Sequence, residues 1–174
     1  MREELDKQLC EKYPLLYRDR NAPMTETAMC WGFCCGEGWY NIIDTLSALL
    51  CSNYNQAKDR YESVKKYYEE GGKWPWVGGK VITPEEVEAK RLEMIEQEKS
   101  VPTVTQVKEK FGTLRFYVGA ATEEHYNYIR FAEALSARTC EVCGAPGKIR
   151  GQGWYYTACD EHTSEGDEDD NIPE

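Results

Sequence analysis

The sequence lacks any long run of apolar residues, and this absence sets the first limits on the protein. A helix needs about 20 consecutive apolar residues to cross a membrane, and no stretch of this chain approaches that length. The first nine residues, MREELDKQL, are charged and lack the apolar segment of a secretory signal peptide. We therefore expect a cytoplasmic protein without membrane contact.

Histidine is also scarce, since the chain holds only 2. His162 belongs to a metal-ligand pattern described below, and His125 follows Glu123 and Glu124 in a polar segment that predicts a surface position. Acidic residues are numerous, but they fall on predicted solvated faces rather than in pairs suited to acid–base catalysis. The sequence therefore shows no catalytic set and favours a binding role over an enzymatic one.

Basic residues are outnumbered, and the resulting negative charge is unevenly distributed. The chain has 21 Lys and Arg against 31 Asp and Glu, which gives a net charge of −10. Residues 163–174 carry six of these carboxylates and no basic residue, so the other 162 residues carry a net charge of −4. An acidic body argues against direct nucleic-acid binding, because lysine and arginine supply most of the affinity for phosphates. We expect a disordered, solvated tail, with mimicry of nucleic-acid phosphates as the alternative.

The hydrophobic pattern predicts an α+β fold that is mostly helical and includes a small antiparallel β-ribbon. Apolar residues at helical spacing predict one uninterrupted helix over residues 39–70. Residues 101–120 fit either a helix or two strands, and the alternation near 114–118 favours a hairpin with Gly112 in its turn. Further helices are expected at residues 2–12, 83–99 and 122–137, the last two beginning at threonine caps.

Four residues near the C-terminus have the spacing of a metal site, namely Cys140, Cys143, Cys159 and His162. Two ligand pairs, each spaced i and i+3, are typical of zinc sites. Because all four positions are protein side chains, none is left for a catalytic water, and the pattern predicts a structural zinc ion. Zinc is the one cofactor that the sequence predicts.

The segment between the two ligand pairs predicts two short strands, at residues 148–150 and 154–157, followed by a helix start. This order of knuckle, hairpin and helix is similar to the treble-clef family of zinc fingers. The chain then divides into a helical α+β body at residues 1–138, a treble-clef zinc module at residues 139–162 and an acidic tail at residues 163–174.

Five cysteines lie outside the zinc pattern: Cys10, Cys30, Cys34, Cys35 and Cys51. In a reducing compartment they are expected to be free thiols, buried as small apolar side chains. A second metal or redox site is the alternative, although two adjacent cysteines match the spacing of a zinc knuckle poorly.

The segment CWGFCCGEGW precedes the predicted long helix and combines aromatic residues with glycines. Its Gly36 and Gly38 predict a tight turn that tucks Trp31 and Trp39 beneath the helix. Glycines that lead into a helix start also form anion cradles, which is the alternative interpretation.

Aromatic and basic residues supply the candidate binding surfaces. Convergence of the tryptophans would form a ligand pocket. Residues 107–117 alternate basic and aromatic side chains, a pattern that suits stacking and pairing with a nucleotide or an acidic partner, although ordinary alternation on a ribbon explains it as well. The candidate residues are Trp31, Trp39, Trp74, Trp76, Lys108, Lys110, Arg115 and Tyr117.

Three runs together resemble a family of small proteins carried by tailed bacteriophages: CWGFCCGEGW at residues 30–39, VKEKFGTLRFY at 107–117 and CEVCGAPG at 140–147. The resemblance extends over about residues 13–162 and brings no known active site with it. It implies a phage accessory protein made in the bacterial cytoplasm. We expect such a protein to counteract antiviral defence by binding a host protein or a nucleotide-type small molecule. A metal-dependent enzyme acting on nucleotides or nucleic acid, and an acidic DNA mimic or transcription regulator, are the alternatives.

Overall fold

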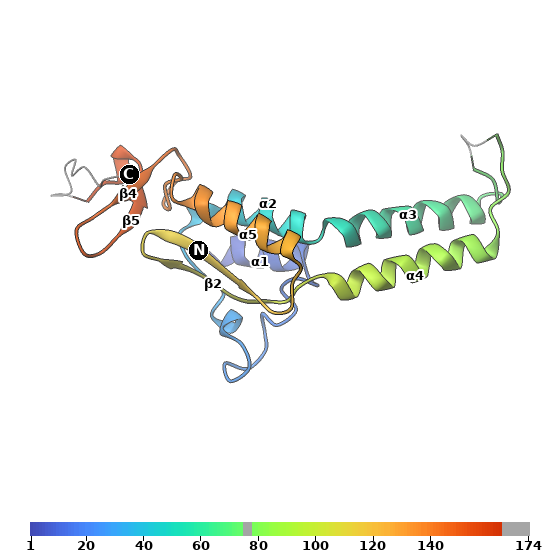
Figure 1. Cartoon of the computed structure of the whole chain (residues 1–174), viewed down its shortest axis with the longest axis horizontal. Coiled ribbons are helices and arrows are strands. Elements are labelled where there is room, and N and C mark those ends of the chain that lie inside the picture. Colours follow the sequence, from blue (N-terminus) through green and yellow to red (C-terminus); the bar gives the residue numbers. More distant parts are fainter. Residues whose placement is uncertain (75–77, 165–174) are drawn as a thin grey trace.

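The computed structural model describes residues 1–74 and 78–164 and shows a central body with an extension at each end (Figure 1). Three helices and a three-stranded sheet form the body, two long helices form one extension, and a two-stranded sheet lies in the other. This architecture confirms the predicted α+β, mostly helical fold. The helices are α1 (Glu3–Lys12), α2 (Tyr40–Leu50), α3 (Ser52–Glu69), α4 (Pro84–Ser100) and α5 (Glu123–Ser136). The strands are β1 (Phe33–Cys34), β2 (Val104–Lys110), β3 (Thr113–Val118), β4 (Lys148–Arg150) and β5 (Tyr156–Ala158). Short 3-10 helices complete the fold: η1 (Ala28–Trp31), η2 (Glu37–Trp39) and η3 (Asp160–His162).

The hairpin predicted within residues 101–120 is confirmed as β2 and β3, which pair antiparallel with Val107 opposite Phe116. Its turn holds Phe111 and Gly112, whose φ angles are 55° and 76°, as in a type I′ turn. The sequence did not predict the third strand, β1, which pairs parallel to β2 with Phe33 beside Val107. A strand of two residues is too short to produce a periodic pattern.

Side chains cover part of both edges of the three-stranded sheet. Along β3, the backbone N–H of Leu114 donates to Ser136 Oγ at 2.8 Å and that of Phe116 donates to Glu133 Oε1 at 3.0 Å, both from α5. At the other edge, the N–H of Phe33 donates to Asp6 Oδ2 of α1 at 3.4 Å. The helices thereby satisfy backbone donors that a sheet edge otherwise leaves unpaired.

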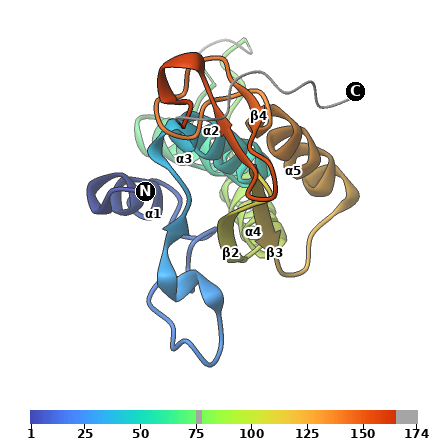
Figure 2. The ribbon, with the colours of Figure 1, turned by 90° about the vertical axis from the view of Figure 1, so that its left-hand side faces the viewer.

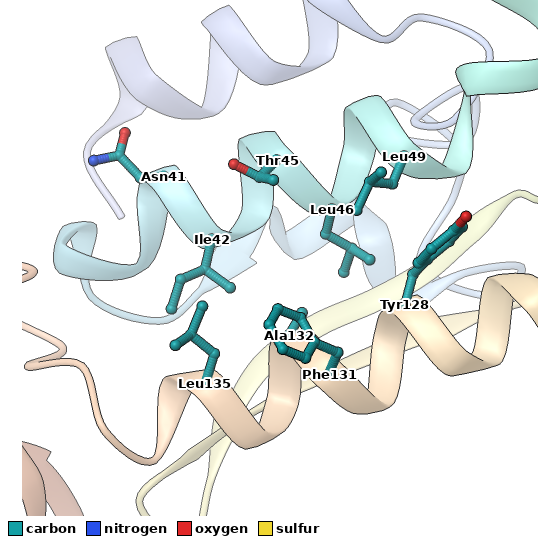
Figure 3. A pocket seen from close by; sticks show the side chains of 9 residues that line it. All are labelled: Asn41, Ile42, Thr45, Leu46, Leu49, Tyr128, Phe131, Ala132 and Leu135. Atoms are coloured by element: carbon teal, nitrogen blue, oxygen red, sulfur yellow. The ribbon is translucent and has the colours of Figure 1, made fainter.

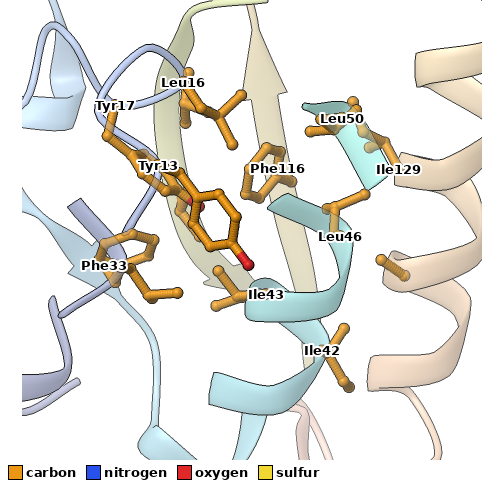
Figure 4. Packing of buried hydrophobic residues seen from close by; sticks show 14 of the residues in the cluster. Tyr13, Leu16, Tyr17, Phe33, Ile42, Ile43, Leu46, Leu50, Phe116 and Ile129 are labelled. Carbon is orange, nitrogen blue, oxygen red and sulfur yellow. The ribbon is translucent and has the colours of Figure 1, made fainter. Parts of the chain in front are cut away.

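The main core lies between the sheet and helices α1, α2 and α5. Phe33 and Phe116 from the sheet meet Ile43 and Leu46 from α2, with Ile129 of α5 beyond them (Figure 4). Figure 2 looks along the long axis and shows α2 and α5 on the same side of the β2–β3 hairpin. The other side of the hairpin is therefore left for polar residues.

The helix predicted over residues 39–70 is divided, because Cys51 separates α2 from α3. Cys51 has φ −98° and ψ 1°, but its N–H still donates to the carbonyl of Ser47 and its own carbonyl accepts from Asn55. The chain thus changes direction without losing backbone pairing. The two halves pack against different partners, α2 on the core and α3 on α4, and the period of apolar residues carries no sign of that change.

The α3–α4 arm extends away from the body as an antiparallel helix pair (Figure 1). Ala57 and Val64 are the buried side chains of α3, and α4 has none. The predicted caps are confirmed, since Thr83 and Glu86 form a complete capping box and Thr122 accepts a hydrogen bond from the N–H of His125. Within residues 1–74 and 78–164, no helix combines the length and apolar character needed to span a membrane.

Candidate metal centre and binding surfaces

The four predicted metal ligands converge at the end of the molecule opposite the arm. A backbone bridge between Thr139 and Pro146 closes the loop that carries the first cysteine pair, and Gly144 has φ 79° just after the second thiol. The strand pair β4–β5 follows, and η3 carries His162 one turn after Cys159. The predicted strand at residues 148–150 is confirmed, and the second strand lies at Tyr156–Ala158. We call residues 139–162 the metal module.

The ligand atoms lie close enough together for one metal ion to contact all four, and two of their printed separations are near those of a tetrahedral zinc site. The Sγ atoms of Cys143 and Cys159 are 3.7 Å apart, and Nδ1 of His162 lies 3.7 Å from the Sγ of Cys140 and 3.1 Å from that of Cys159. Zinc bonds of about 2.3 Å to sulfur and about 2.0 Å to nitrogen imply edges of about 3.8 Å and about 3.6 Å. All four ligand atoms lie within 4.8 Å of one another. The site is therefore positioned to bind a metal ion and is compatible with zinc.

Local hydrogen bonding prepares Cys140 to act as a ligand. Burial opposes ionisation of this thiol, but backbone N–H groups of Cys159, Cys143 and Val142 outweigh it and lower the pKa to about 6. The thiolate is the form that binds metals. The knuckle thus favours the ionised sulfur before any ion arrives.

A buried arginine braces the second ligand pair. The guanidinium of Arg150 donates through Nε to the carbonyl of Ala158 at 3.1 Å and pairs with the carboxylate of Asp160. These partners flank Cys159 on both sides. Arg150 therefore fixes the backbone that presents the third thiol.

The metal module packs on the glycine segment that precedes α2. The N–H of Gly38 donates to the carbonyl of Glu141 at 2.8 Å, and the N–H of Gly36 donates to the Glu141 carboxylate at 2.7 Å. A Cβ on Gly38 would lie 2.2 Å from the carbonyl oxygen of Cys140. The glycines are thus needed for close approach to the metal-binding loop. The alternative of an anion cradle has a counterpart here, because Gly36 donates to a carboxylate of the chain itself, that of Glu141.

Two of the candidate tryptophans have opposite environments. Trp39 is fully buried and its Nε1 donates to the carbonyl of Thr139 at 2.7 Å, so it links the body to the metal module. Trp31 was expected to be tucked beneath the helix as well, which is wrong, because its side chain is 64% exposed. Trp31 is the last residue of η1, and η1 lies beside β2 rather than under α2.

The structure does not bring the tryptophans together into a pocket. Trp74 lies at the far end of the arm, where its ring is 5.9 Å from that of Tyr67. Trp39 lies before α2 at the other end of the two successive helices (Figure 1). Trp76 falls outside the described residues, as does the acidic tail from Glu165 onward. The described candidate tryptophans therefore do not all converge on one pocket.

The basic and aromatic candidates of the hairpin do share one face. Lys108 lies directly opposite Arg115, and Tyr117 lies opposite Gln106. Because Val107 faces the core, strand alternation directs these neighbours to the outer face. The ammonium of Lys108 lies 5.6 Å from the centre of the Tyr117 ring, and that of Lys110 lies 5.2 Å from the centre of the Phe111 ring.

An apolar groove between α2 and α5 was not foreseen from the sequence (Figure 3). Its volume is about 230 Å³, and Phe131 at its rim is 68% exposed. On α5, Tyr126 and Leu135 are exposed apolar residues, while Ile129 and Ala132 are buried. The sequence did hold one signal for this groove, because α5 has more apolar residues than a single inward-facing stripe needs. The lining residues are Asn41, Ile42, Thr45, Leu46, Leu49, Tyr128, Phe131, Ala132 and Leu135.

His125 is buried, contrary to the surface position expected. Its Nδ1 accepts a hydrogen bond from the N–H of Thr122 at 3.4 Å, which completes the cap of α5. Burial lowers its pKa, so the ring is neutral at physiological pH. The neighbouring Glu123 and Glu124 accept hydrogen bonds from Arg130 and Tyr128 instead, so the polarity of this segment did not indicate the environment of His125.

The remaining cysteines are mostly protected thiols, as expected, with one exception. Burial raises the pKa of Cys10 and Cys35 to about 12 and that of Cys51 to about 11. Cys30 is half-buried, but Cys34 is exposed, which corrects the expectation of burial. Within the described ranges, the ligands of the metal module form the one group of three or more residues able to hold a metal ion.

The fold and the site define an α+β protein with a Cys₃His metal centre packed on a helical body. The sequence matches no protein-family model, and neither the curated proteins nor the solved structures give a significant match. What the protein does must therefore be argued from its own surfaces.

Proposed function

We propose that the chain is a phage-encoded accessory protein that acts in the bacterial cytoplasm by binding a host protein. The metal ion in this proposal is a structural zinc, and the metal module is a treble clef. The observation that carries the binding role is the apolar α2–α5 groove. The phage origin and a target in antiviral defence rest on the sequence resemblance.

The arrangement of the metal centre supports a structural ion over a catalytic one. Four protein side chains supply a full tetrahedral set, whereas catalytic zinc sites have three protein ligands and an open position. The loop that bears Cys140 is also pressed against Gly38, which leaves no space for a substrate on that side. The ion therefore serves to hold the module against the body.

The composition of the groove suits a protein partner. None of its nine lining residues is charged, although 30% of the chain consists of charged residues. Depletion of charge and enrichment of aromatic side chains are features of the centres of protein interfaces. Two antiparallel helices form its walls, and a third helix packs on such a pair by inserting apolar side chains spaced i, i+3 and i+4.

The partner is a different protein with an amphipathic helix, rather than a second copy of this chain. Each copy has a net charge of −10, so self-association would bring together two molecules of like net charge. The buried faces of α2 and α5 are already packed in the core, so neither helix is free to insert into the groove of a second copy. A host helix with apolar residues on one side and basic residues on its flanks fits both requirements.

Substitution of Phe131 tests this proposal. Tagged full-length protein and its F131E variant would be expressed in bacteria, and proteins that differ between the two purifications would be identified by mass spectrometry. The differing protein would then be purified and its affinity measured by calorimetry. We expect F131E to weaken the complex by about 30-fold, the effect of removing a residue that contributes about 2 kcal/mol or more.

The matched control is L92E, which places the same charge at an exposed leucine of α4. It should leave the affinity unchanged, and circular dichroism should be the same for both variants. Two results would overturn the proposal. One is a partner that binds wild type and F131E equally. The other is a wild-type dimer in light scattering that F131E converts to a monomer, since the groove would then be occupied by a second copy.

A further inference from the structure

The outer face of the β2–β3 hairpin is basic in a protein that is otherwise acidic. It carries Lys108, Lys110 and Arg115, which alternate with the core residues of the two strands. Glu109 is the one acidic residue in either strand, and its register partner Leu114 is buried, so its carboxylate lies on the core side. That carboxylate accepts a hydrogen bond from the N–H of Gly112 at 2.6 Å.

The cations on this face have no carboxylate partner within the described parts of the chain. Lys108 and Arg115 are directly opposite each other, and like charges in that position destabilise a sheet. Arg115 bonds only to the carbonyl of Leu114 and to Thr113, and both lysines lie over aromatic rings. An anion placed over Lys108 and Arg115 would relieve the repulsion between them.

Exposed aromatic rings accompany these cations. Tyr117 is 40% exposed on the same face, and Phe111 is 66% exposed in the turn. Phe111 has φ 55°, a left-handed conformation that is costly for a bulky residue and that glycine or asparagine adopts more easily. Since its exposed ring buries little, packing does not explain the choice of phenylalanine. Strained, exposed residues of this kind point to a functional role.

The partly covered sheet edges affect how a ligand can approach. Ser136 and Glu133 occupy two backbone donors of β3, and Asp6 occupies one of β1. These contacts hinder the addition of a strand, which favours a partner that lies across the face. Tyr117 lies opposite Gln106, and from that position to Phe111 the chain extends over about 16 Å at 3.3 Å per residue, so the cations and rings form an elongated track rather than a point.

From these features we infer that the outer face of the hairpin binds single-stranded nucleic acid. The phosphates lie on Lys108, Lys110 and Arg115, and unpaired bases stack on Tyr117 and Phe111. Aromatic platforms with adjacent cations on an open sheet are a general means of holding single strands. An acidic peptide would use the cations but offers no bases to stack on the exposed rings.

This site is independent of the α2–α5 groove proposed for a host protein. The acidic composition argued against nucleic-acid binding, but net charge averages over the whole chain. The sheet gathers three cations from two strands onto one surface and keeps the local carboxylate on the other. A local track of this size supports modest affinity with weak dependence on base sequence.

The inference is tested by fluorescence anisotropy with labelled dT20 and rU20, using the full zinc-loaded chain. For three cations the expected slope of log affinity against log salt is about −2, at about −0.7 for each phosphate contact on a single strand. Affinity should therefore fall about 20-fold between 50 and 200 mM salt. The variant K108E/R115E should reduce the slope to about −0.7, because Lys110 alone remains.

Two further variants separate stacking from charge. F111N and Y117A should each weaken binding by at least about fivefold, the lower end of the effect of losing one stacked base. The control K65E/K66E makes the same change of net charge on exposed residues of α3 and should change affinity less than twofold. Circular dichroism and zinc content are measured on every variant to show that the fold persists.

Three results would overturn the inference. The first is no change in anisotropy with either strand at about 100 μM protein and 50 mM salt, where even non-specific phosphate contacts give detectable binding. The second is equal weakening by K65E/K66E, which would indicate a general charge effect. The third is equally tight binding of a labelled polyglutamate peptide that F111N does not weaken, which would show that the face recognises acidic chains instead.

Discussion

The metal module and the α3–α4 arm lie at opposite ends of the molecule and are held by different forces. At the metal end, a few backbone hydrogen bonds and close glycine contacts join segments far apart in the sequence. In the arm, two long helices are neighbours in sequence, and only Ala57 and Val64 of α3 are buried. The metal module therefore depends on close backbone contacts, and the arm depends on a narrow stripe of apolar contact between its helices.

Ion pairs do not make up for the small core of the arm. Arg60 of α3 reaches Glu93 of α4 at 2.9 Å, and Arg91 pairs with Glu88 at 2.7 Å within α4, all of them on the exposed surface. Pairs of this kind contribute little in water and are screened by salt. The comparison teaches that few fully buried side chains hold the two longest helices of this protein. It also suggests that each end can be disturbed without the other.

Removal of the metal should have the largest effect and should be confined to one end. We expect C143S, or a chelator added to the wild type, to unfold the metal module, because structural zinc contributes on the order of 10 kcal/mol to small modules. Hydrogen exchange should then become fast in residues 139–162 and stay unchanged in α3 and α4.

The control is C34S, which removes an exposed thiol outside the ligand set and should leave both ends protected. Loss of protection in the arm after metal removal would show that the two ends are coupled, and the comparison would fail.

Gly38 should be the next most sensitive position. A methyl group there would lie 2.2 Å from the carbonyl oxygen of Cys140, so G38A must push the metal module away from the body. We expect the free energy of unfolding to fall by about 3 kcal/mol, the upper range for overpacking a tight site. Loss of the hydrogen bond from Trp39 should also alter the near-ultraviolet circular dichroism.

The matched control for this position is G119A. A methyl group on Gly119 would meet its nearest neighbour, the carbonyl oxygen of Thr103, at 3.8 Å, which is ordinary contact. G119A should therefore have little effect on stability. Equal effects of the two substitutions would mean that the close approach at Gly38 is unimportant.

A smaller effect is expected in the arm. V64A removes two buried methyl groups and should reduce the stability of the helix pair by about 2 kcal/mol. Because the arm is stabilised separately, faster exchange should be limited to residues 52–69 and 84–100. V81A, at an exposed valine near the end of the arm, is the control and should change nothing measurable. Faster hydrogen exchange in the metal module of V64A would contradict the separate stabilisation of the two ends.

The smallest expected change is a gain in stability. F111N replaces a strained residue in the hairpin turn by one that tolerates positive φ, and asparagine before glycine is favoured in type I′ turns. The free energy of unfolding should rise by about 1 kcal/mol, which urea titration can measure. The Lys110 contact with the ring is lost, but it is exposed and weak. A decrease in stability would show that the ring packs on something that its exposure does not reveal.

Local signals predicted those parts of the fold that depend on local interactions. The threonine caps, the hairpin turn at Gly112 and the ligand spacing of the metal module each involve residues a few positions apart, and all were correct. The break at Cys51 was not predicted, because it arises from a change of packing partner. His125 was expected at the surface and is buried, whereas Trp31 was expected to be buried and is exposed. Both errors have the same reason, because burial depends on which distant segment packs against the residue.

The candidate surfaces show the same limit. Alternation in residues 107–117 correctly grouped Lys108, Arg115 and Tyr117 on one face, since a strand fixes that geometry. The apolar groove depends on which side of α5 meets α2, and nothing in the α5 sequence alone specifies that pairing. The role of Gly36 and Gly38 required knowledge of a segment about 100 residues away.

The contact between Trp39 and Thr139 has a consequence for how the protein is made. The two residues are 100 positions apart. Thr139 directly precedes the metal ligands, the last of which is His162. During synthesis the body can collapse around its sheet while the last part of the chain is still within the ribosome. Domains generally fold as they emerge, N-terminal parts first, and contacts of long sequence separation form late. Capture of the metal and closure over Trp39 would then follow the folding of the body, so metal supply would limit the completion of this end rather than the initial folding of the chain.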